Sequence, residues 1–412
     1  MRFRSCLLTL VLALAARGAD WPGFLGPNAD GTAPDTHLIH AFAPAGPTVL
    51  WTVPLAPGFG GPAVSAGQVF ILDRDGSAKE NNQRDVLRCL DLASGKELWT
   101  YAYAAPGKVE YDGTRSTPAV DAQAVYTLGT FGQLTCVGRT THQPLWSLNL
   151  LKDFGGSRPQ WGVALSPVLY KGWVLVAPQS KTVGLVALDK ATGKVVWKSP
   201  PIGDMAYSSP TVTTIDGVTQ AVVQNGSGAH GVNLENGQLL WSCDFPCKFL
   251  IPQPTPIGDG RLFLTGGYKA GCAMFKIERQ ADAWKTTALW RLPNHGAQIH
   301  RALLIDHYLY GNCNDGNEGL VCLGLDGQEK WHTGGKPSLD RGGFLYADGL
   351  LWSMDGANGT LRIIQPDPAA YKELAGAKLL GGQQVWGCMA LSDGHLLARD
   401  QKQLKCVDLR AK

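Results

Sequence analysis

Short apolar stretches alternate with polar turns along almost the whole chain, and this pattern predicts β-strands. Segments such as 68–72 (QVFIL) and 124–128 (AVYTL) are rich in β-branched and aromatic residues, which favour strands. Hairpins such as 86–99 (VLRCLDLASGKELW) follow them. The apolar spacing of an amphipathic helix of several turns is missing. The sequence therefore predicts an all-β protein.

The strand pattern repeats. Tryptophans recur roughly every 46 residues, which is the length of a four-stranded propeller blade. These residues are Trp51, Trp99, Trp146, Trp197, Trp241, Trp290 and Trp331. A proline at the start of the innermost strand recurs with them, at Pro62, Pro118, Pro167, Pro210 and Pro256. Degenerate copies of this second marker follow at Ala302, Gly343 and Ala390, which gives eight units in all.

The eighth unit lacks a fourth strand at its end, 404–410 (LKCVDLR). The missing strand is available in 48–55 (TVLWTVPL), before the first inner strand. Pairing these two segments would close the ring and remove its free sheet edges. We therefore predict an eight-bladed β-propeller of four-stranded antiparallel blades over residues 49–412, closed by an N-terminal strand.

The hairpins also indicate how blades join. A glycine stands four residues before the tryptophan, in a turn that requires positive φ, at Gly95, Gly193, Gly237 and Gly327. His142 and Thr286 hold that place in two copies, where we expect different turns. A small residue fills one slot of the third strand, at Cys89, Cys136, Ala187, Gly231, Cys322 and Cys406. We expect the tryptophans to pack over this slot of a neighbouring blade, at Trp99, Trp146, Trp197, Trp241, Trp290 and Trp331.

The N-terminal segment has the features of a secretory signal peptide over residues 1–18. Arg2 and Arg4 precede a short apolar run, and small residues follow at cleavage spacing. The run is too short for a permanent membrane span, and no lipobox precedes Cys6. We therefore expect a periplasmic or secreted protein.

Residues 19–48 would then form a strap before the propeller. We expect Trp21 and Phe24 to fix this strap to the side of the propeller, and a role of the strap in partner docking is the alternative.

The charge balance narrows the choice of partners. The chain has 37 Lys and Arg against 34 Asp and Glu, and loss of Arg2, Arg4 and Arg17 with the signal would make it formally neutral. No run of basic residues remains to bind nucleic acid or an anionic membrane surface. We expect neither partner.

Cys243 and Cys247, in the stretch CDFPC, are the candidate disulfide, because an exported protein meets an oxidising compartment. The alternative is that both are free thiols. The cysteines of the third-strand slot are expected to be buried replacements for alanine.

The stretch 187–197 (ALDKATGKVVW) resembles the tryptophan-docking repeat of quinoprotein dehydrogenases, which carry pyrroloquinoline quinone (PQQ). The stretch 20–31 (DWPGFLGPNADG) resembles the start of exported bacterial PQQ-like repeat propellers. The resemblance covers nearly all of the chain after residue 18. The same repeat builds the outer-membrane assembly lipoprotein BamB and the larger quinoprotein alcohol dehydrogenases. It implies the fold, whereas a cofactor depends on residues at the central channel.

For quinoprotein dehydrogenases, the resemblance implies two adjacent cysteines above the quinone, a tryptophan below it and a calcium ion held by oxygen ligands. This sequence has no adjacent cysteine pair, and no set of Glu, Asn and Asp aligns with its inner strands. We carry over no catalytic residue and predict neither a cofactor nor a metal. PQQ with Ca²⁺ belongs only to the alternative function.

Candidate ligand-binding residues stand just before the inner strands, where propeller loops meet at the mouth of the channel. They are Arg115, Gln160, Trp161, Tyr207, Gln253, His300, Arg301, Arg341 and Trp386. Arginine, aromatic and amide groups that converge on a channel suit a polar or anionic ligand or a peptide. The alternative is that they only form hydrogen bonds between blades.

These observations predict a monomeric, non-catalytic binding or scaffold module of the bacterial envelope. Its partner would be an envelope protein, a peptide or a glycan. The first alternative is a divergent PQQ-dependent dehydrogenase, and the second is a BamB-like factor for outer-membrane protein assembly.

Overall fold

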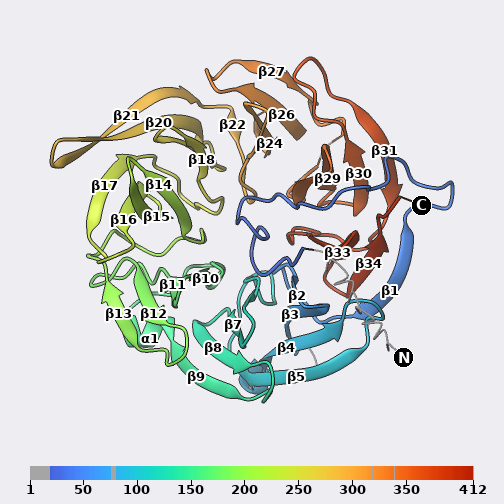
Figure 1. Ribbon diagram of the computed structural model, residues 1–412, viewed down its shortest axis with the longest axis horizontal. Coiled ribbons are helices and arrows are strands. Elements are labelled where there is room, and N and C mark those ends of the chain that lie inside the picture. The colour runs from blue at the N-terminus through green and yellow to red at the C-terminus, as the bar shows by residue number, and fades with distance from the viewer. Residues whose placement is uncertain (1–18, 76–79, 317–318, 338, 412) are drawn as a thin grey trace, which may run out of the picture.

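Eight four-stranded antiparallel sheets surround a central axis (Figure 1). The computed structural model describes residues 19–75, 80–316, 319–337 and 339–411. The predicted eight-bladed, all-β propeller is therefore confirmed. The expected signal peptide, residues 1–18, lies outside the described residues.

The first four blades follow one another along the chain. Blade 1 contains β2 (Ala63–Ser65), β3 (Gln68–Arg74), β4 (Arg84–Asp91) and β5 (Glu97–Ala104), with the 3₁₀ turn η1 (Glu80–Asn82) before β4. Blade 2 contains β6 (Ala119–Val120), β7 (Ala124–Leu128), β8 (Gln133–Gly138) and β9 (Pro144–Asn149), and the short helix α1 (Leu150–Phe154) follows it. Blade 3 contains β10 (Val168–Tyr170), β11 (Trp173–Val176), β12 (Val186–Asp189) and β13 (Val195–Lys198). Blade 4 contains β14 (Thr211–Ile215), β15 (Val218–Gln224), β16 (Gly228–Asn233) and β17 (Leu239–Asp244).

The last four blades complete the ring. Blade 5 contains β18 (Thr255–Gly258), β19 (Arg261–Gly266), β20 (Gly271–Gln280) and β21 (Ala283–Leu292). Blade 6 contains β23 (Leu303–Ile305), β24 (Tyr308–Cys313), β26 (Gly319–Gly324) and β27 (Glu329–His332), and β22 (His295–Gly296) pairs with β25 (Asp315–Gly316) beside it. Blade 7 contains β28 (Phe344–Ala347), β29 (Leu350–Met354), β30 (Thr360–Ile364) and β31 (Glu373–Lys378). Blade 8 contains β32 (Ala390–Ser392), β33 (His395–Arg399), β34 (Gln403–Asp408) and β1 (Thr48–Pro54). In the described part of the chain, no helix is long and apolar enough to cross a membrane.

The ring closes as predicted, with an N-terminal strand in the last blade. Strand β1 pairs antiparallel with β34, so that Trp51 lies opposite Cys406. Figure 1 shows the blue β1 alongside the red β34. Because β1 is the fourth strand of blade 8, no blade is left with an unpaired third strand.

The tryptophans join the blades, although not through the contact that we expected. The small residue of the third strand lies directly opposite the tryptophan of its own blade, as in the pairs Ala187 and Trp197 or Cys136 and Trp146. The Trp146 ring instead packs on Gly193, in the turn of the next blade, and its Nε1 donates to the Lys190 carbonyl at 2.8 Å. The expected packing over a neighbouring blade's slot is therefore wrong, because the indole extends toward the next turn.

The same contact recurs around the ring. The indole Nε1 atoms of Trp51, Trp197, Trp290 and Trp331 donate to the carbonyl oxygens of Leu92, Leu234, Leu325 and Asp367 in the following blade, at 2.8, 3.1, 2.9 and 2.8 Å. The turns that receive the rings are themselves held by aspartate, since Asp189 Oδ1 accepts from the Thr192 backbone N–H at 2.9 Å.

The two turns without glycine differ, as predicted. His142 adopts a φ of 57°, and its ring stacks on Trp99 with centroids 4.8 Å apart. Thr286 lies within the long strand β21, whose hairpin extends outward past blade 4 in Figure 1. Its hydroxyl donates to the Ser242 carbonyl at 3.1 Å, and Trp241 donates to Gln220 of its own blade instead.

Hydroxyl groups beside the inner strands form a second set of bonds between blades. Ser116 Oγ donates to the Leu165 carbonyl of the next blade at 2.6 Å. Thr255 Oγ1 donates in the same way to the Ala302 carbonyl at 2.7 Å. Serine and threonine thus supply hydrogen bonds between blades near the axis.

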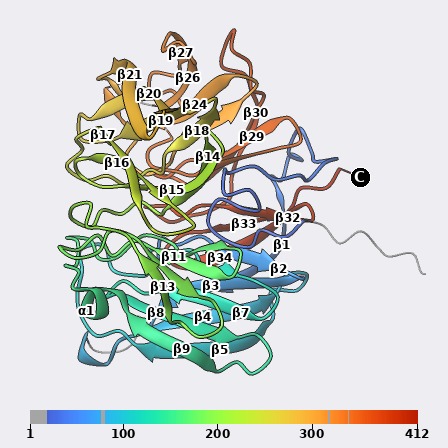
Figure 2. The ribbon, with the colours of Figure 1, turned by 60° about the vertical axis from the view of Figure 1, so that its left-hand side comes forward.

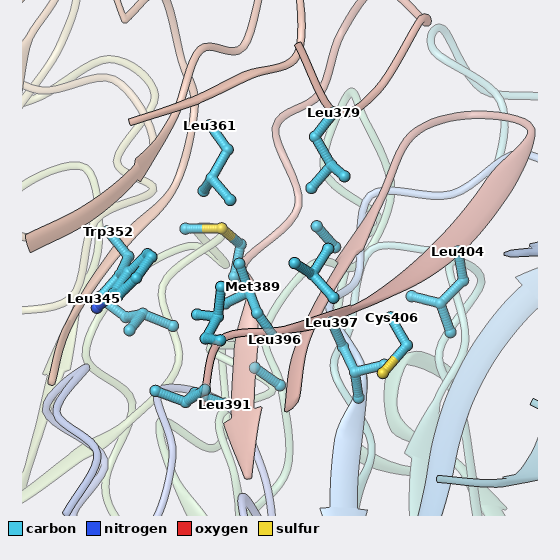
Figure 3. Packing of buried hydrophobic residues seen from close by; sticks show 14 of the residues in the cluster. Leu345, Trp352, Leu361, Leu379, Met389, Leu391, Leu396, Leu397, Leu404 and Cys406 are labelled. Carbon is cyan, nitrogen blue, oxygen red and sulfur yellow. The ribbon is translucent and has the colours of Figure 1, made fainter. Parts of the chain in front are cut away.

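Apolar side chains fill the spaces between adjacent sheets. Figure 3 shows Leu345 and Trp352 of blade 7 packed with Leu396 and Leu397 of blade 8. Trp51 and Trp21 belong to the same buried cluster. Blade closure and the N-terminal segment therefore share one core.

We expected Trp21 and Phe24 to fix the N-terminal segment to the side of the propeller, and this expectation is wrong. The segment crosses the centre of one face (Figures 1 and 2). Trp21 pairs with Val64 of blade 1, and Thr32 pairs with Tyr346 of blade 7. The inner strands of these blades end at this face with backbone groups free to pair, so the segment lies across the ring.

Substitution Gly193→Ala should destabilise the protein more than Gly217→Ala. Both glycines have positive φ, 69° and 76°, but an added Cβ would lie 2.6 Å from the Trp146 ring only at position 193. We expect a loss of about 2–4 kcal/mol in the free energy of unfolding for Gly193→Ala and about 1 kcal/mol for Gly217→Ala. Urea unfolding midpoints measure the difference. Equal losses would contradict a role of the glycine in receiving the indole ring.

Candidate functional site

A cavity of about 210 Å³ lies at the centre of the ring, and we call it the funnel. In an antiparallel blade, loops between second and third strands share one face with loops that lead to the next blade. These loops supply nearly all of the funnel lining, and Phe24 comes from the N-terminal segment that crosses the opposite face. The funnel is lined by Phe24, Phe59, Gly61, Tyr111, Arg115, Thr117, Trp161, Ala164, Tyr207, Ile251, Gln253, Tyr268, Gln298, Ile299, His300, Arg341, Trp386 and Cys388.

The structure brings most of the predicted binding residues together here. The lining includes Arg115, Trp161, Tyr207, Gln253, His300, Arg341 and Trp386. Gln160 is not part of it; its side-chain nitrogen lies 3.4 Å from Glu110 Oε2 at the surface. Arg301 is buried outside the lining and donates to the Ala29 carbonyl of the N-terminal segment at 3.3 Å.

Several lining residues were not among the predicted binding residues, above all Phe59, Tyr111, Tyr268 and Cys388. Phe59 precedes the Pro62 marker and could have been found in the same way as the other residues before inner strands. Tyr268 lies in the loop between β19 and β20, where no repeated marker points to it.

An aromatic cluster forms one wall of the funnel around Trp161. The Trp161 ring centroid lies 4.6 Å from that of Phe249 and 5.2 Å from that of Tyr207. Tyr268 packs edge-on against Phe249 at 5.1 Å. Trp161 Nε1 also donates to Glu110 Oε2 at 3.2 Å, which orients the indole. We call Trp161, Tyr207, Phe249 and Tyr268 the Trp161 wall, in which Phe249 packs against the other rings without lining the funnel.

A second aromatic cluster faces the funnel around Trp386. Phe59 stacks on Trp386 with centroids 5.6 Å apart, and Tyr111 meets the same ring edge-on at 5.7 Å. Trp386 Nε1 donates to Asp340 Oδ2 at 2.9 Å. We call Phe59, Tyr111 and Trp386 the Trp386 wall.

Two arginines accompany the Trp386 wall and differ in their charge partners. The Arg341 guanidinium lies over Trp386 at 5.2 Å and forms an ion pair with Asp340 at 3.0 Å. Arg115 lies over Phe59 at 5.6 Å, and its guanidinium donates to the backbone carbonyls of Glu110, Tyr111 and Gly113. Burial lowers the pKa of Arg115 to about 10, despite the nearby Asp112, so this side chain is a cation at neutral pH.

The floor of the funnel contains a histidine and a thiol that are both uncharged. His300 Nε2 donates to the Arg341 carbonyl at 3.1 Å, which leaves Nδ1 as an acceptor 3.7 Å from the Cys388 sulfur. Burial lowers the pKa of His300 to about 4 and raises that of Cys388 to about 12. The thiol therefore stays protonated, and the pair does not provide a thiolate nucleophile.

The funnel lining does not fit a calcium-bound quinone. Calcium requires several oxygen ligands, usually from carboxylates. The lining contains no Asp, Glu or Asn, and its side-chain amides are Gln253 and Gln298. In the described ranges, no group of three or more His, Cys, Asp or Glu is arranged to hold a metal ion.

Cys243 and Cys247, the candidate disulfide, are both buried free thiols in the structure. Cys243 lies on β17 opposite Ala229, whereas Cys247 Sγ lies 3.5 Å from the Gly267 carbonyl oxygen of blade 5. The two sulfur atoms thus contact different neighbours. Burial also raises the pKa of both thiols to about 11.

Comparison with known proteins gives a family and a fold. A family model described as outer membrane protein assembly factor BamB matches residues 83–333. The dehydrogenase subunit of the quinone alcohol dehydrogenase of Komagataeibacter europaeus is 29% identical over 136 residues. That alignment covers 30% of this chain and only 18% of the relative.

Two solved structures share the fold. BamB from Moraxella catarrhalis superposes with a TM-score of 0.60 at 13% identity, over 89% of this chain and 98% of its own. A quinohemoprotein alcohol dehydrogenase from Comamonas testosteroni superposes with a TM-score of 0.64 at 12% identity, over 97% of this chain and 82% of its own. BamB and an alcohol dehydrogenase thus share this architecture, so the fold alone does not select a function.

Substitution His300→Gln should weaken the dependence of stability on acid pH. The folded protein holds the pKa of His300 at about 4, below its usual 6.5, because a charged imidazole would be desolvated. Stability from this residue is present above pH 6.5 and is lost as the pH falls toward 4. The free energy of unfolding of the wild type should therefore approach that of His300→Gln by about 2–3 kcal/mol between pH 7.5 and 4.5. Urea titrations at both pH values measure this. His230, whose pKa burial also lowers to about 4, is present in both proteins, so a constant gap would contradict the prediction for His300.

Proposed function

The chain belongs to the family described as outer membrane protein assembly factor BamB, and from that premise we propose a non-catalytic binding module whose funnel takes an anionic ligand. The observation that carries the proposal is the chemistry of the funnel lining. Two guanidinium groups lie over aromatic rings there, and no carboxylate is part of the lining. A site of this composition favours an anion over a cation.

The roles of other residues support binding over mere closure of the ring. The alternative was that the residues before the inner strands only form bonds between blades. Serine and threonine supply such bonds near the axis, as at Ser116 and Thr255, and tryptophans join the blades farther out. Trp161 and Trp386 also donate to Glu110 and Asp340 of neighbouring loops, but these bonds use only the indole nitrogens, so the aromatic faces of the two walls support a binding role.

The dehydrogenase alternative is less well supported. The sequence has no adjacent cysteine pair, and the lining has no oxygen donor set for calcium. The similarity to the quinone alcohol dehydrogenase subunit covers less than a fifth of that protein, so its activity does not transfer to this chain. Bound PQQ would supply hydride-acceptor chemistry, but no residue here is positioned to hold it through calcium.

We place this module in the bacterial envelope, because residues 1–18 have the features of a signal peptide. We propose that it is a monomer. Its ligand would be a peptide, a glycan or an exposed part of an envelope protein. A cavity of about 210 Å³ suits a side chain or another small group rather than a folded domain. The role of a BamB-like assembly factor is compatible with this binding mode.

Incubation of the mature protein with PQQ and Ca²⁺ tests the proposal. After gel filtration, we expect no quinone absorbance in the protein fraction and no dye-linked oxidation of alcohols or aldoses. Stoichiometric quinone binding with turnover, lost in Trp161→Ala or Trp386→Ala, would overturn the proposal.

Capture of envelope components supplies the positive test. Immobilised wild type should retain a peptide or glycan that Arg115→Ala and Arg341→Ala fail to retain. Arg84→Ala is the matched control, because Arg84 is an exposed arginine outside the funnel. Equal capture by all four proteins would argue against the funnel as the binding site.

A further inference from the structure

We propose that the funnel binds a carboxylate attached to a single flat apolar ring. This inference rests on the proposed function and names the ligand class of the same site. Two features carry it: among the described residues Arg115 supplies a positive charge that belongs to no ion pair, and the two aromatic walls contribute to the same lining.

Arg115 differs from the other arginine of the lining in its counter-charge. Among the ion pairs of the described residues, Arg341 has Asp340 at 3.0 Å, whereas Arg115 takes part in none. Its hydrogen-bond acceptors are backbone carbonyls, including that of Glu110 at 2.9 Å, and the nearby Asp112 is already paired with Arg74 at 3.0 Å. A partly buried guanidinium without a carboxylate is stabilised when an anion binds beside it.

One guanidinium outside the ion pairs of the described residues predicts one anionic group on the ligand. Asp340 already neutralises Arg341 and also accepts from Trp386 Nε1 at 2.9 Å. A ligand with several carboxylates would leave all but one without a positive partner. The charge pattern therefore favours a monoanion at Arg115.

The walls predict the body of the ligand. Their exposed aromatic residues are Tyr111, 41% exposed, and Tyr268, 38% exposed, and both contribute to the lining. Both tyrosines have left-handed backbones, with φ of 57° and 60°, a conformation that bulky residues rarely adopt. A flat ring placed between the walls would pack against aromatic faces on two sides.

Several polar groups of the lining are already bonded within the protein, which disfavours a sugar. Thr117 Oγ1 accepts from the Gly61 N–H at 3.1 Å, and Gln298 Oε1 accepts from Arg341. His300 is bonded to the Arg341 carbonyl and to Cys388. A bound saccharide would therefore depend mainly on the tyrosine hydroxyls and Gln253 for its hydrogen bonds.

The size of the funnel agrees with one ring and a short acid. Its volume of about 210 Å³ exceeds that of an engineered cavity of about 150 Å³ that binds benzene, and lies below the usual range for drug-sized ligands. A free aromatic acid and the C-terminal aromatic residue of a peptide share this chemistry, and the test below separates them.

Isothermal titration of the full mature protein with matched probes tests the inference. We expect 3-phenylpropionate to bind about tenfold or more tightly than 3-phenyl-1-propanol, because only the acid pairs with Arg115. Glucuronate, an acid on a polar ring, should bind more weakly than 3-phenylpropionate. This comparison of probes on the wild type needs no variant.

Two further titrations distinguish a free aromatic acid from the C-terminal residue of a peptide as the ligand. A tetrapeptide that ends in phenylalanine with a free carboxylate is compared with its C-terminal amide. Tighter binding of the peptide acid than of 3-phenylpropionate identifies a chain end as the ligand, and the reverse order identifies a free acid. Both orders support the ring-bearing carboxylate, provided that the amide loses about tenfold in affinity.

Variants locate the anion. Arg115→Gln should lower the affinity for 3-phenylpropionate about tenfold, and Arg115→Lys should lower it less, because the charge remains. Arg341→Gln should have a smaller effect than Arg115→Gln, since Asp340 already pairs with Arg341. Arg84→Gln, outside the funnel, is the matched control.

Equal affinity for the acid and the alcohol would overturn the inference, as would tighter binding of glucuronate. In either case, capture that still depends on Arg115 would leave the binding function itself intact. Quinone binding with turnover would instead contradict the function, so the two failures are distinguishable.

Discussion

The fold depends on an indole ring that packs on a left-handed turn of the next blade. Trp146 on Gly193 is the representative case, and the Lys190 carbonyl accepts its N–H. The contact requires a turn residue without a side chain below the ring. Where that turn is absent, another group takes over, such as the stacked ring of His142 or the long hairpin that includes Thr286. Each solution keeps adjacent sheets at a spacing that their buried apolar side chains fill.

This arrangement separates the residues that support the ring from those that line its centre. The supporting residues repeat with each blade, because every blade meets its neighbour through a similar surface. The funnel residues do not repeat: Trp161, Trp386, Arg115 and Arg341 each come from one blade only. Proteins that share this fold can therefore have different central chemistry, as the shared fold of BamB and a quinohemoprotein alcohol dehydrogenase illustrates.

The repeat made the fold predictable, whereas the site was predictable only in part. Tryptophan and proline spacing gave eight blades and the closing strand, because packing between sheets enforces a period. Loops carry no period, so Tyr268 left no signal. Gln160 and Arg301 were expected beside Trp161 and His300, but only one residue of each pair lines the funnel, because the Gln160 side chain lies beside Glu110 and the Arg301 side chain donates to the Ala29 carbonyl. The path of the N-terminal segment was missed because Thr32 and Tyr346 meet without any shared motif.

Ring closure also constrains the order in which the molecule can be completed. Strand β1 pairs with β34, roughly 350 residues later in the chain, so the contact between Trp51 and Cys406 is among the least local in the protein. Until β34 has been synthesised, β1 has no sheet to join, and the outer face of the first blade lacks the Trp51 ring that packs on Gly95. Nascent chains would therefore expose apolar strand edges until late in folding. A chaperone that shields such edges during export would act on this intermediate rather than on the finished ring.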